Sequence, residues 1–183
     1  MSPQTGNRNS LRKKIQGLLI TMEDILIRPI GPADNTAMAA ILRRSMEEFG
    51  VNRPGTVYYD DTTDHLFELF NATPNSVYFV AEKEGKLMGG AGVYPTDGLP
   101  EATCELVKMY LSPAARGQGL GRHMIDRCLK QAAGLGFTQV YLETMPELTK
   151  AISMYEKFGF SFLAGPMGNS GHNGCAVWMI KKL

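Results

Sequence analysis

The spacing of hydrophobic residues divides the chain, from about residue 25 onwards, into short strands and amphipathic helices. Apolar runs bounded by turn residues predict strands over residues 25–29, 77–82, 86–94, 104–111, 139–143, 160–163 and 175–180. Apolar residues that recur about every 3.6 positions predict helices over residues 32–49, 62–70, 119–134 and 146–158. The pattern shows no internal repeat and predicts one α/β domain over residues 23–183.

Local signals suggest where these helices begin and end. Thr144-Met145-Pro146-Glu147 reads as a capping box, so the helix over residues 146–158 is expected to start there and to end at Gly159. Asp61 or Thr62 is the candidate cap of the helix over residues 62–70. The apolar stripe of the first helix is predicted to comprise Met38, Ile41, Leu42, Met46 and Phe49.

Residues 1–22 differ from the rest of the chain. They combine a polar start, the basic triplet Arg12-Lys13-Lys14 and an apolar patch of only a few residues. A secretory signal requires an apolar region of about 7 to 15 residues and a small-residue cleavage site, and this segment has neither. We therefore expect an extension outside the fold.

Composition narrows the range of partners. The 183 residues are 44% hydrophobic and 20% charged, with a formal net charge of +1. A charge this small predicts neither nucleic acid nor a membrane surface as partner, and no apolar run approaches the roughly 20 residues that span a bilayer. Three widely spaced cysteines indicate neither a disulfide framework nor a metal site. The expected location is the cytoplasm.

A glycine-rich turn, Arg116-Gly117-Gln118-Gly119-Leu120-Gly121, joins the strand ending at Leu111 to the helix over residues 119–134. Main-chain N–H groups at such a turn are unshielded, and they lie at the positive end of the helix dipole. This combination favours phosphate binding. The nearby basic residues outnumber a single acid, Asp126, and are Lys108, Arg116, Arg122, Arg127 and Lys130.

The order Arg116-x-x-Gly119-x-Gly121 after this strand resembles the acetyl-CoA signature of the GNAT superfamily of N-acetyltransferases. A dinucleotide-binding Gly-x-Gly-x-x-Gly would need glycine where Arg122 stands, and a Walker loop needs Gly-Lys-Ser/Thr, which is absent. A second GNAT-like segment runs from Ala151 through Tyr155 to Gly159-Phe160. The resemblance covers residues 23–183. It departs from the family at Leu148, where an Asn that contacts pantetheine is common.

The resemblance implies a fold and a co-substrate. The fold would be a mixed, mostly antiparallel twisted sheet of six to seven strands with helices on both faces. Acetyl-CoA would lie between the fourth and fifth strands, with no metal. The cofactor-binding residues would be the main chain of Met109, Tyr110 and Leu111, the turn residues Arg116, Gly117, Gln118, Gly119, Leu120 and Gly121, and Tyr155.

The chemistry of acetyl transfer requires a base for the amine, and Glu105 is the first candidate. Strict alternation places it on one face with Val107, Met109 and Leu111, where burial would raise the pKa of its carboxyl. A bulge in this strand would instead leave Glu105 in solvent or in an ion pair. Glu143 and His172 are the second and third candidates.

Tyr155 is the candidate general acid. Its hydroxyl would donate a proton to the departing thiolate. The alternative is that Tyr155 is a core aromatic residue beside Ile152 and Phe158. The resemblance implies direct attack of the amine without an acyl-enzyme.

The acceptor is predicted to be a primary amine of a small molecule. Its specificity would come from residues 49–61 and 165–174, where Asp60, Asp61 and Asp64 could attract a cation. Two alternatives stay open, a protein or peptide N-terminus or lysine as acceptor, and a non-catalytic acyl-CoA-binding sensor. The protein is expected to be a monomer or homodimer.

Overall fold

A computed structural model describes residues 24–183, which form one seven-stranded sheet in the order β1-β2-β3-β4-β5-β7-β6. The predicted extension over residues 1–22 lies outside the described residues. Neighbouring strands are antiparallel except β4 and β5, which are parallel. The mixed, mostly antiparallel sheet predicted above is therefore confirmed. The strands are β1 (Leu26–Pro29), β2 (Val77–Lys83), β3 (Lys86–Tyr94), β4 (Thr103–Leu111), β5 (Gln139–Thr144), β6 (Ser161–Phe162) and β7 (Val177–Lys182).

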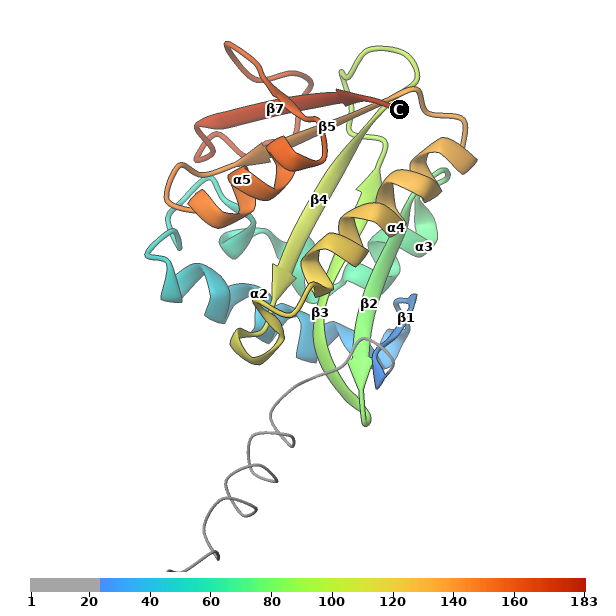
Figure 1. The fold of residues 1–183 in the computed structure, drawn as a ribbon, viewed down its shortest axis with the longest axis vertical. Coiled ribbons are helices and arrows are strands. Elements are labelled where there is room, and N and C mark those ends of the chain that lie inside the picture. Colours follow the sequence, from blue (N-terminus) through green and yellow to red (C-terminus); the bar gives the residue numbers. More distant parts are fainter. Residues whose placement is uncertain (1–23) are drawn as a thin grey trace, which may run out of the picture.

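Helices cover both faces of this sheet. The α-helices are α2 (Asn35–Glu48), α3 (Leu66–Ala72), α4 (Leu120–Gly134) and α5 (Thr149–Lys157), and short 3-10 turns are η2 (Pro32–Asp34), η3 (Val57–Tyr59), η4 (Asp61–Asp64) and η5 (Pro113–Ala115). In Figure 1, α4 and α5 lie in front of the sheet, and α2 and α3 lie behind it. No helix within residues 24–183 has the length and apolar content needed to cross a membrane.

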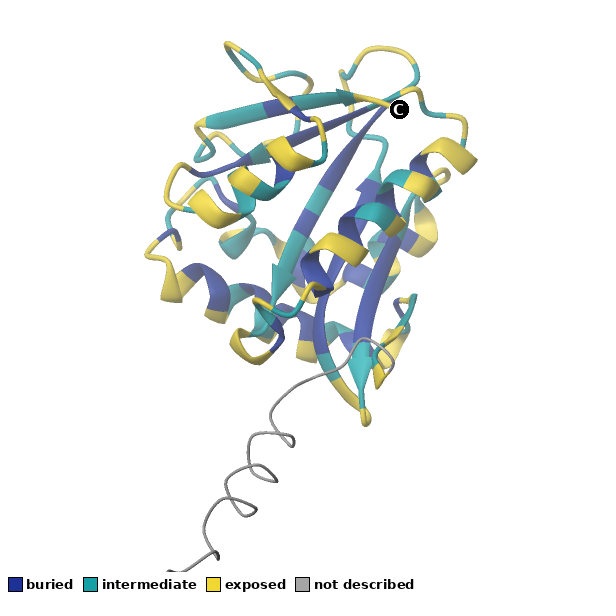
Figure 2. Cartoon of the chain, in the orientation of Figure 1, coloured by how far each residue is buried: buried dark blue, intermediate teal, exposed yellow. Residues whose placement is uncertain are grey.

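The core consists of two apolar layers, one on each side of the sheet. The layer under α4 and α5 contains Leu120, Met124, Ile125, Cys128 and Tyr155, packed on one face of β2 to β5. The layer under α2 and α3 contains Met38, Leu42, Leu66 and Phe70. Figure 2 shows this arrangement as buried central strands and helices that are buried only on their inner sides. Removing these apolar surfaces from water is the main stabilising contribution to the fold.

Three of the predicted helix details are wrong. Thr144 belongs to β5 and pairs with Val177, so it cannot cap a helix, and α5 begins at Thr149 instead. The segment expected to form one helix from residue 62 is the 3-10 turn η4 followed by α3. The N-cap of η4 is Asp60, whose side chain accepts a hydrogen bond from the Thr62 N–H. Phe49 is 40% exposed, because it lies beyond the end of α2.

A β-bulge in β4 separates residues that strict alternation would place together. Lys108 has φ of 49°, in the left-handed region, and the pairing with β3 shifts register between Gly90 and Gly92. After the bulge Met109 and Leu111 pack in the layer under α4, while Val107 and Tyr110 pack in the layer under α2 and α3. The predicted common face of Glu105, Met109 and Leu111 is therefore wrong.

Beyond Glu105, β4 and β5 diverge and no longer pair with each other. Their register comprises Thr103 with Gln139, Cys104 with Val140 and Glu105 with Tyr141. Since the last residues of β4 have no strand on the β5 side within the described chain, the sheet opens a cleft there.

Candidate active site

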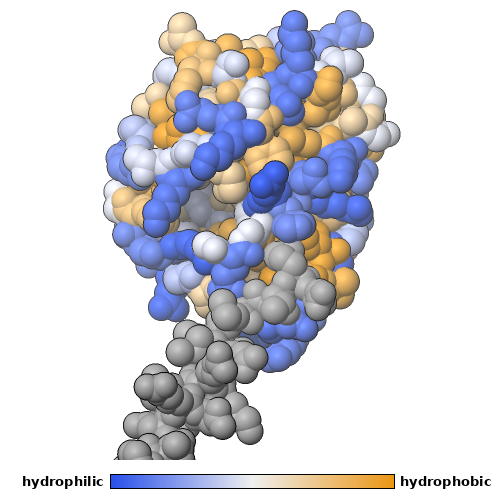
Figure 3. Space-filling model, viewed as in Figure 1, coloured by the Kyte–Doolittle hydropathy of each residue, from blue (hydrophilic) through white to orange (hydrophobic). Residues whose placement is uncertain are grey.

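A cavity of about 70 Å³ lies where β4 and β5 part, and we call it the strand cleft. Its walls come from β4, from the end of β5, from α5 and from the segment before η3. The space-filling view shows this face hollowed between α5 and the end of α2 (Figure 3). The lining includes Glu105, Lys108, Met109, Tyr110, Glu143, Leu148, Ala151, Tyr155, His172 and Cys175.

The glycine-rich turn presents main-chain donors at the start of α4. Gly117 and Gly119 have φ of 73° and 86°, values that favour glycine, and a Cβ at either would meet open space. Within the described chain, no main-chain N–H of residues 117–122 donates a hydrogen bond to another group. A Cβ at Gly121 would lie 3.0 Å from Met154 Cε, so this glycine lets α4 and α5 approach closely. The turn is thus an open cradle of donors.

Four of the five basic side chains near this turn contact other groups. Arg116 points to α2, where it donates to Glu48 at 2.7 Å and to Ser45 at 3.0 Å and stacks over Phe49. Arg127 stacks over Phe79, Lys130 pairs with Asp126, and Lys108 lies buried on the far side of the sheet. The main chain of the turn, rather than a basic cluster, is therefore the structural candidate for holding an anion.

Two of the three predicted residues at the end of β4 reach the cleft. Met109 and Tyr110 line it. Leu111 does not, and its carbonyl already accepts hydrogen bonds from Ser45 Oγ at 3.2 Å and from Arg116 Nε at 3.0 Å. The main chain of Met109 and Tyr110 is consequently the part of this strand that is free to meet an extended ligand.

Glu105 is 4% exposed, although a bulge follows it in the strand. Burial raises the pKa of its carboxyl to about 7, and the nearby Glu143 carboxylate adds to this rise. The Thr96 hydroxyl donates to one carboxyl oxygen and opposes the rise. No hydrogen bond from the described chain reaches the other oxygen. A carboxyl that is half ionised at neutral pH is suited to accept a proton.

The other two candidate bases are more heavily engaged. Both carboxylate oxygens of Glu143 accept hydrogen bonds, from Tyr141 Oη at 2.8 Å and from Ser170 Oγ at 2.9 Å. His172 Nε2 lies 3.5 Å from Asp60 Oδ2. Glu105 therefore keeps the freest proton-accepting atom of the three.

Tyr155 lies both in the core and at the strand cleft, the surroundings expected of a core aromatic residue and of a general acid. Its ring packs edge-on against Phe160 in the core, and the residue is 6% exposed. Its hydroxyl points into the strand cleft, 3.8 Å from Met109 Sδ. Burial raises the pKa of this hydroxyl well above its usual value, so it carries its proton at neutral pH.

A second cavity, of about 360 Å³, lies on the α2 and α3 side of β4, and we call it the side pocket. It shares Glu105, Val107, Lys108 and His172 with the strand cleft. Its remaining lining is Asp60, Thr62, Leu69, Phe70, Tyr94, Thr96, Asp97, Asn169 and Ser170. The two cavities therefore have a wall in common, and Glu105 is part of it.

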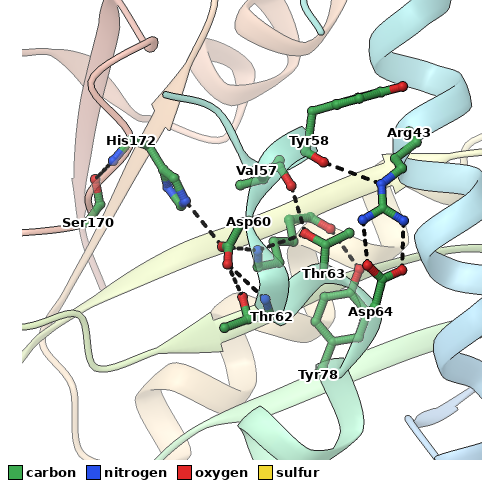
Figure 4. Close-up of polar contacts among 11 residues, drawn as sticks. Arg43, Val57, Tyr58, Asp60, Thr62, Thr63, Asp64, Tyr78, Ser170 and His172 are labelled. Carbon is green, nitrogen blue, oxygen red and sulfur yellow. Dashed lines mark hydrogen bonds and ion pairs between the residues drawn. The ribbon is translucent and has the colours of Figure 1, made fainter. Parts of the chain in front are cut away.

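Lys108 and Asp60 form a buried ion pair in the wall of the side pocket, which sequence reasoning missed. Lys108 Nζ lies 2.8 Å from Asp60 Oδ2 and 3.3 Å from Thr63 Oγ1, and its side chain is 5% exposed. His172 approaches the same carboxylate from the opposite loop (Figure 4). A second charged residue after Glu105, placed between Val107 and Met109 in a mostly apolar strand, was the available signal.

Two main-chain hydrogen bonds join three loops beside the two cavities. The loop after β3 is bonded to the loop before β7, because Asn169 N–H donates to the Asp97 carbonyl at 2.7 Å. The same loop is bonded to the segment before η3 through Gly174 N–H and the Gly55 carbonyl at 2.8 Å. Of the three acids predicted to attract a cation, Asp60 lines the pocket, whereas Asp64 pairs with Arg43 outside it.

A family model described as "Acetyltransferase (GNAT) family" matches residues 38–160, which include the glycine-rich turn and Tyr155. The chain belongs to the GNAT acetyltransferase family. An uncharacterised N-acetyltransferase of Escherichia coli K12, YjgM, is 35% identical over 165 residues, which cover 90% of this chain and 98% of that protein. The resemblance predicted from the two motifs is confirmed, and the GNAT protein described here is an N-acetyltransferase.

Solved GNAT structures share the fold at low identity. The PaiA N-acetyltransferase of Thermoplasma acidophilum, in complex with coenzyme A, has a TM-score of 0.68 and 18% identity, covering 87% of this chain and 99% of that one. The acetyltransferase YncA of Salmonella typhimurium, with acetyl-CoA, has a TM-score of 0.67 and 22% identity, covering 86% and 93%. No group of three or more metal-ligating side chains is found among residues 24–183 of the GNAT protein.

Proposed function

We propose that this enzyme transfers an acetyl group from acetyl-CoA to the primary amine of a small molecule by direct attack. Acetyl-CoA would enter along the strand cleft, and the amine would occupy the side pocket. One observation carries the proposal, namely that the buried residue Glu105 lines both cavities. A base in this position reaches the amine of one substrate beside the thioester of the other.

Donor binding is supported by the main chain of the turn. A diphosphate accepts hydrogen bonds readily from N–H groups at the start of a helix, and residues 117–122 offer such groups. Arg116 would contribute through its main chain and by fixing the turn against α2, since its guanidinium is already paired with Glu48. The extended arm of the co-substrate would add to the open side of β4 at Met109 and Tyr110.

Proton transfers would involve two residues. As the amine nitrogen forms a bond to the acetyl carbon, its proton passes to Glu105, and the carbon–sulfur bond breaks. The thiolate takes a proton from the Tyr155 hydroxyl, which bulk solvent later replaces. Cys175 also lines the strand cleft, but burial raises the pKa of its thiol to about 12, so it is not a thiolate nucleophile at neutral pH. This favours direct attack over an acyl-enzyme.

The loops at the side pocket favour a small acceptor. A polypeptide needs an open groove for its main chain, whereas here the loops carrying Asp97 and Asn169, which both line the pocket, are hydrogen-bonded to each other. A cavity of this size can surround a small molecule on several sides, and ligand pockets usually bury most of the ligand surface in this way.

The test is release of free thiol from acetyl-CoA across a panel of small primary amines and peptides, with coenzyme A affinity measured in parallel. We expect turnover with small amines that Glu105→Gln lowers by roughly 100-fold or more, with coenzyme A affinity retained. Turnover restricted to peptides would establish the protein acceptor instead. Coenzyme A binding without turnover on any amine would indicate a sensor.

A further inference from the structure

Both basic side chains of the side pocket are directed at one internal carboxylate. Asp60 Oδ2 lies 2.8 Å from Lys108 Nζ and 3.5 Å from His172 Nε2. The Asp60 carboxylate is also fixed by Thr62, whose N–H and hydroxyl both donate hydrogen bonds to its other oxygen, Oδ1 (Figure 4). Burial alone would raise the pKa of Asp60, but His172 and Lys108 hold it well below its usual value. Asp60 is thus an anion that engages both basic side chains.

Two further carboxyl groups line the pocket and form no direct ion pair with its described lining residues, although the more distant His172 and Lys108 oppose the rise in the Glu105 pKa. Glu105 receives a hydrogen bond from the neutral Thr96 hydroxyl, and Asp97 receives one from the neutral Asn169 amide at 3.3 Å. Because Lys108 and His172 both face Asp60, the carboxyl groups of Glu105 and Asp97 add to a lining that favours positive charge in an incoming molecule. A substrate carboxylate would be repelled by it, whereas an ammonium group would be attracted.

Part of the remaining wall is apolar. Leu69 and Phe70 from α3, Tyr94 from β3 and Val107 from β4 line the same cavity. The rings of Phe70 and Tyr94 meet edge-on, with centroids 5.5 Å apart. Such a wall favours an apolar or aromatic body over a polar one, because burying that body removes apolar surface from water.

We propose that the acceptor is a primary amine carried on an apolar, preferably aromatic, body that lacks a carboxylate, an arylalkylamine rather than an amino acid. The inference deepens the proposed function and rests on it. Asp60 is the specificity-determining residue, because its pairing with Lys108 and His172 leaves the pocket without a cation that could receive a substrate carboxylate. The volume of about 360 Å³ lies at the small end of ligand sites.

The test compares phenethylamine with phenylalanine, which differ by the carboxylate alone. We expect the kcat/KM of the full-length enzyme to favour phenethylamine on the order of 100-fold, since placing like charges together costs several kcal/mol. Ethylamine, which lacks the apolar body, is expected to be at least tenfold poorer than phenethylamine. Values within threefold for phenethylamine and phenylalanine, or a preference for phenylalanine, would overturn the inference while leaving the acetyl transfer itself intact.

Binding supplies a readout that does not depend on turnover. With coenzyme A present, calorimetric titration should detect phenethylamine more tightly than phenylalanine. If no amine were acetylated but this order of binding held, the proposed reaction would fail and the assignment of the ligand class would stand. Equal binding, or none for either compound, would refute the ligand class.

The role of Asp60 is tested by Asp60→Asn, with Asp61→Asn as the matched control in the same turn. Asparagine keeps an oxygen that can cap Thr62, but it removes the negative charge that faces Lys108 and His172. The preference for phenethylamine over phenylalanine should narrow by at least tenfold in Asp60→Asn and stay unchanged in Asp61→Asn. The same ratio in both variants would refute the role of Asp60. Should Asp60→Asn fail to fold, the turnover and binding ratios of the natural enzyme still decide the ligand class.

Discussion

Replacing Glu105 with Gln should stabilise the enzyme at alkaline pH while it disables catalysis. The carboxyl is buried, and its pKa is raised from 4.5 to about 7. The folded protein therefore binds the Glu105 proton more tightly than the unfolded chain does. Ionising this residue consequently lowers the free energy of unfolding.

The sign and size of the effect follow from these two pKa values. Below pH 4.5 the carboxyl is protonated in both states and has no effect on stability. As pH rises from 4.5 to about 7, the unfolded chain loses the proton first, so the stability of the folded enzyme falls. Above pH 7 the loss is complete and amounts to about 3 kcal/mol, at 1.36 kcal/mol for each pKa unit between the two states. Gln cannot ionise, and it retains an oxygen that can accept the Thr96 hydrogen bond, so it escapes this loss.

The assay is urea denaturation of both proteins at pH 5 and pH 8. The free energy of unfolding of Glu105→Gln should exceed that of the natural enzyme by about 3 kcal/mol at pH 8 and by less than about 1 kcal/mol at pH 5. Glu101→Gln, a change on the exposed turn before β4, serves as control and should show no such dependence on pH. If Glu105→Gln were no more stable than the natural enzyme at pH 8, the carboxyl would not be desolvated and its assignment as the base would lose its physical basis.

Three further predictions test the remaining parts of the site. Gly119→Trp should abolish coenzyme A binding in calorimetry, whereas Gly119→Ala, which carries the same strain of about 1 kcal/mol without the bulk, should keep affinity within about tenfold; equal affinities would remove the diphosphate from this turn. Tyr155→Phe should lower kcat roughly 100-fold with coenzyme A affinity nearly unchanged, and an unaltered kcat would leave Tyr155 as a packing residue. Thr96→Val removes a hydrogen bond that lowers the Glu105 pKa, so the acid limb of kcat/KM should move up by about 1 pH unit, and a limb that stays in place would separate Thr96 from the base.

Patterns that depend on neighbouring residues allowed much of the fold to be predicted. The strands and helices expected from periodicity are present, and the glycine-rich turn precedes α4 as the spacing of Gly117 and Gly119 required. Tyr155 was identified through a motif, and its hydroxyl reaches the cleft that Met109 lines. These features follow from local backbone preferences, which a sequence displays directly.

Features that depend on distant contacts were not predictable in the same way. The Thr144 to Glu147 segment satisfies a capping pattern, yet Thr144 is held in β5 by its pairing with Val177. Sheet pairing thus overrides a local helix signal. The second cavity was equally hidden, because its wall joins Asp60 to Lys108 across 48 positions of sequence. Loops that converge on one pocket leave no common spacing in the chain.

The bulge at Lys108 decides which face of the sheet each later residue of β4 occupies. An inserted residue exchanges the two faces of everything that follows it, which separates Glu105 from Met109 and lets both Val107 and Lys108 line the side pocket. The conformation is held by Tyr78, whose hydroxyl donates to the Lys108 carbonyl at 2.7 Å. Tyr78 fits only because β3 carries glycine opposite it, since a Cβ at Gly90 or Gly92 would lie 2.5 or 2.7 Å from its ring. Glycines in β3 therefore determine, through one tyrosine, where the charged groups of β4 line the side pocket.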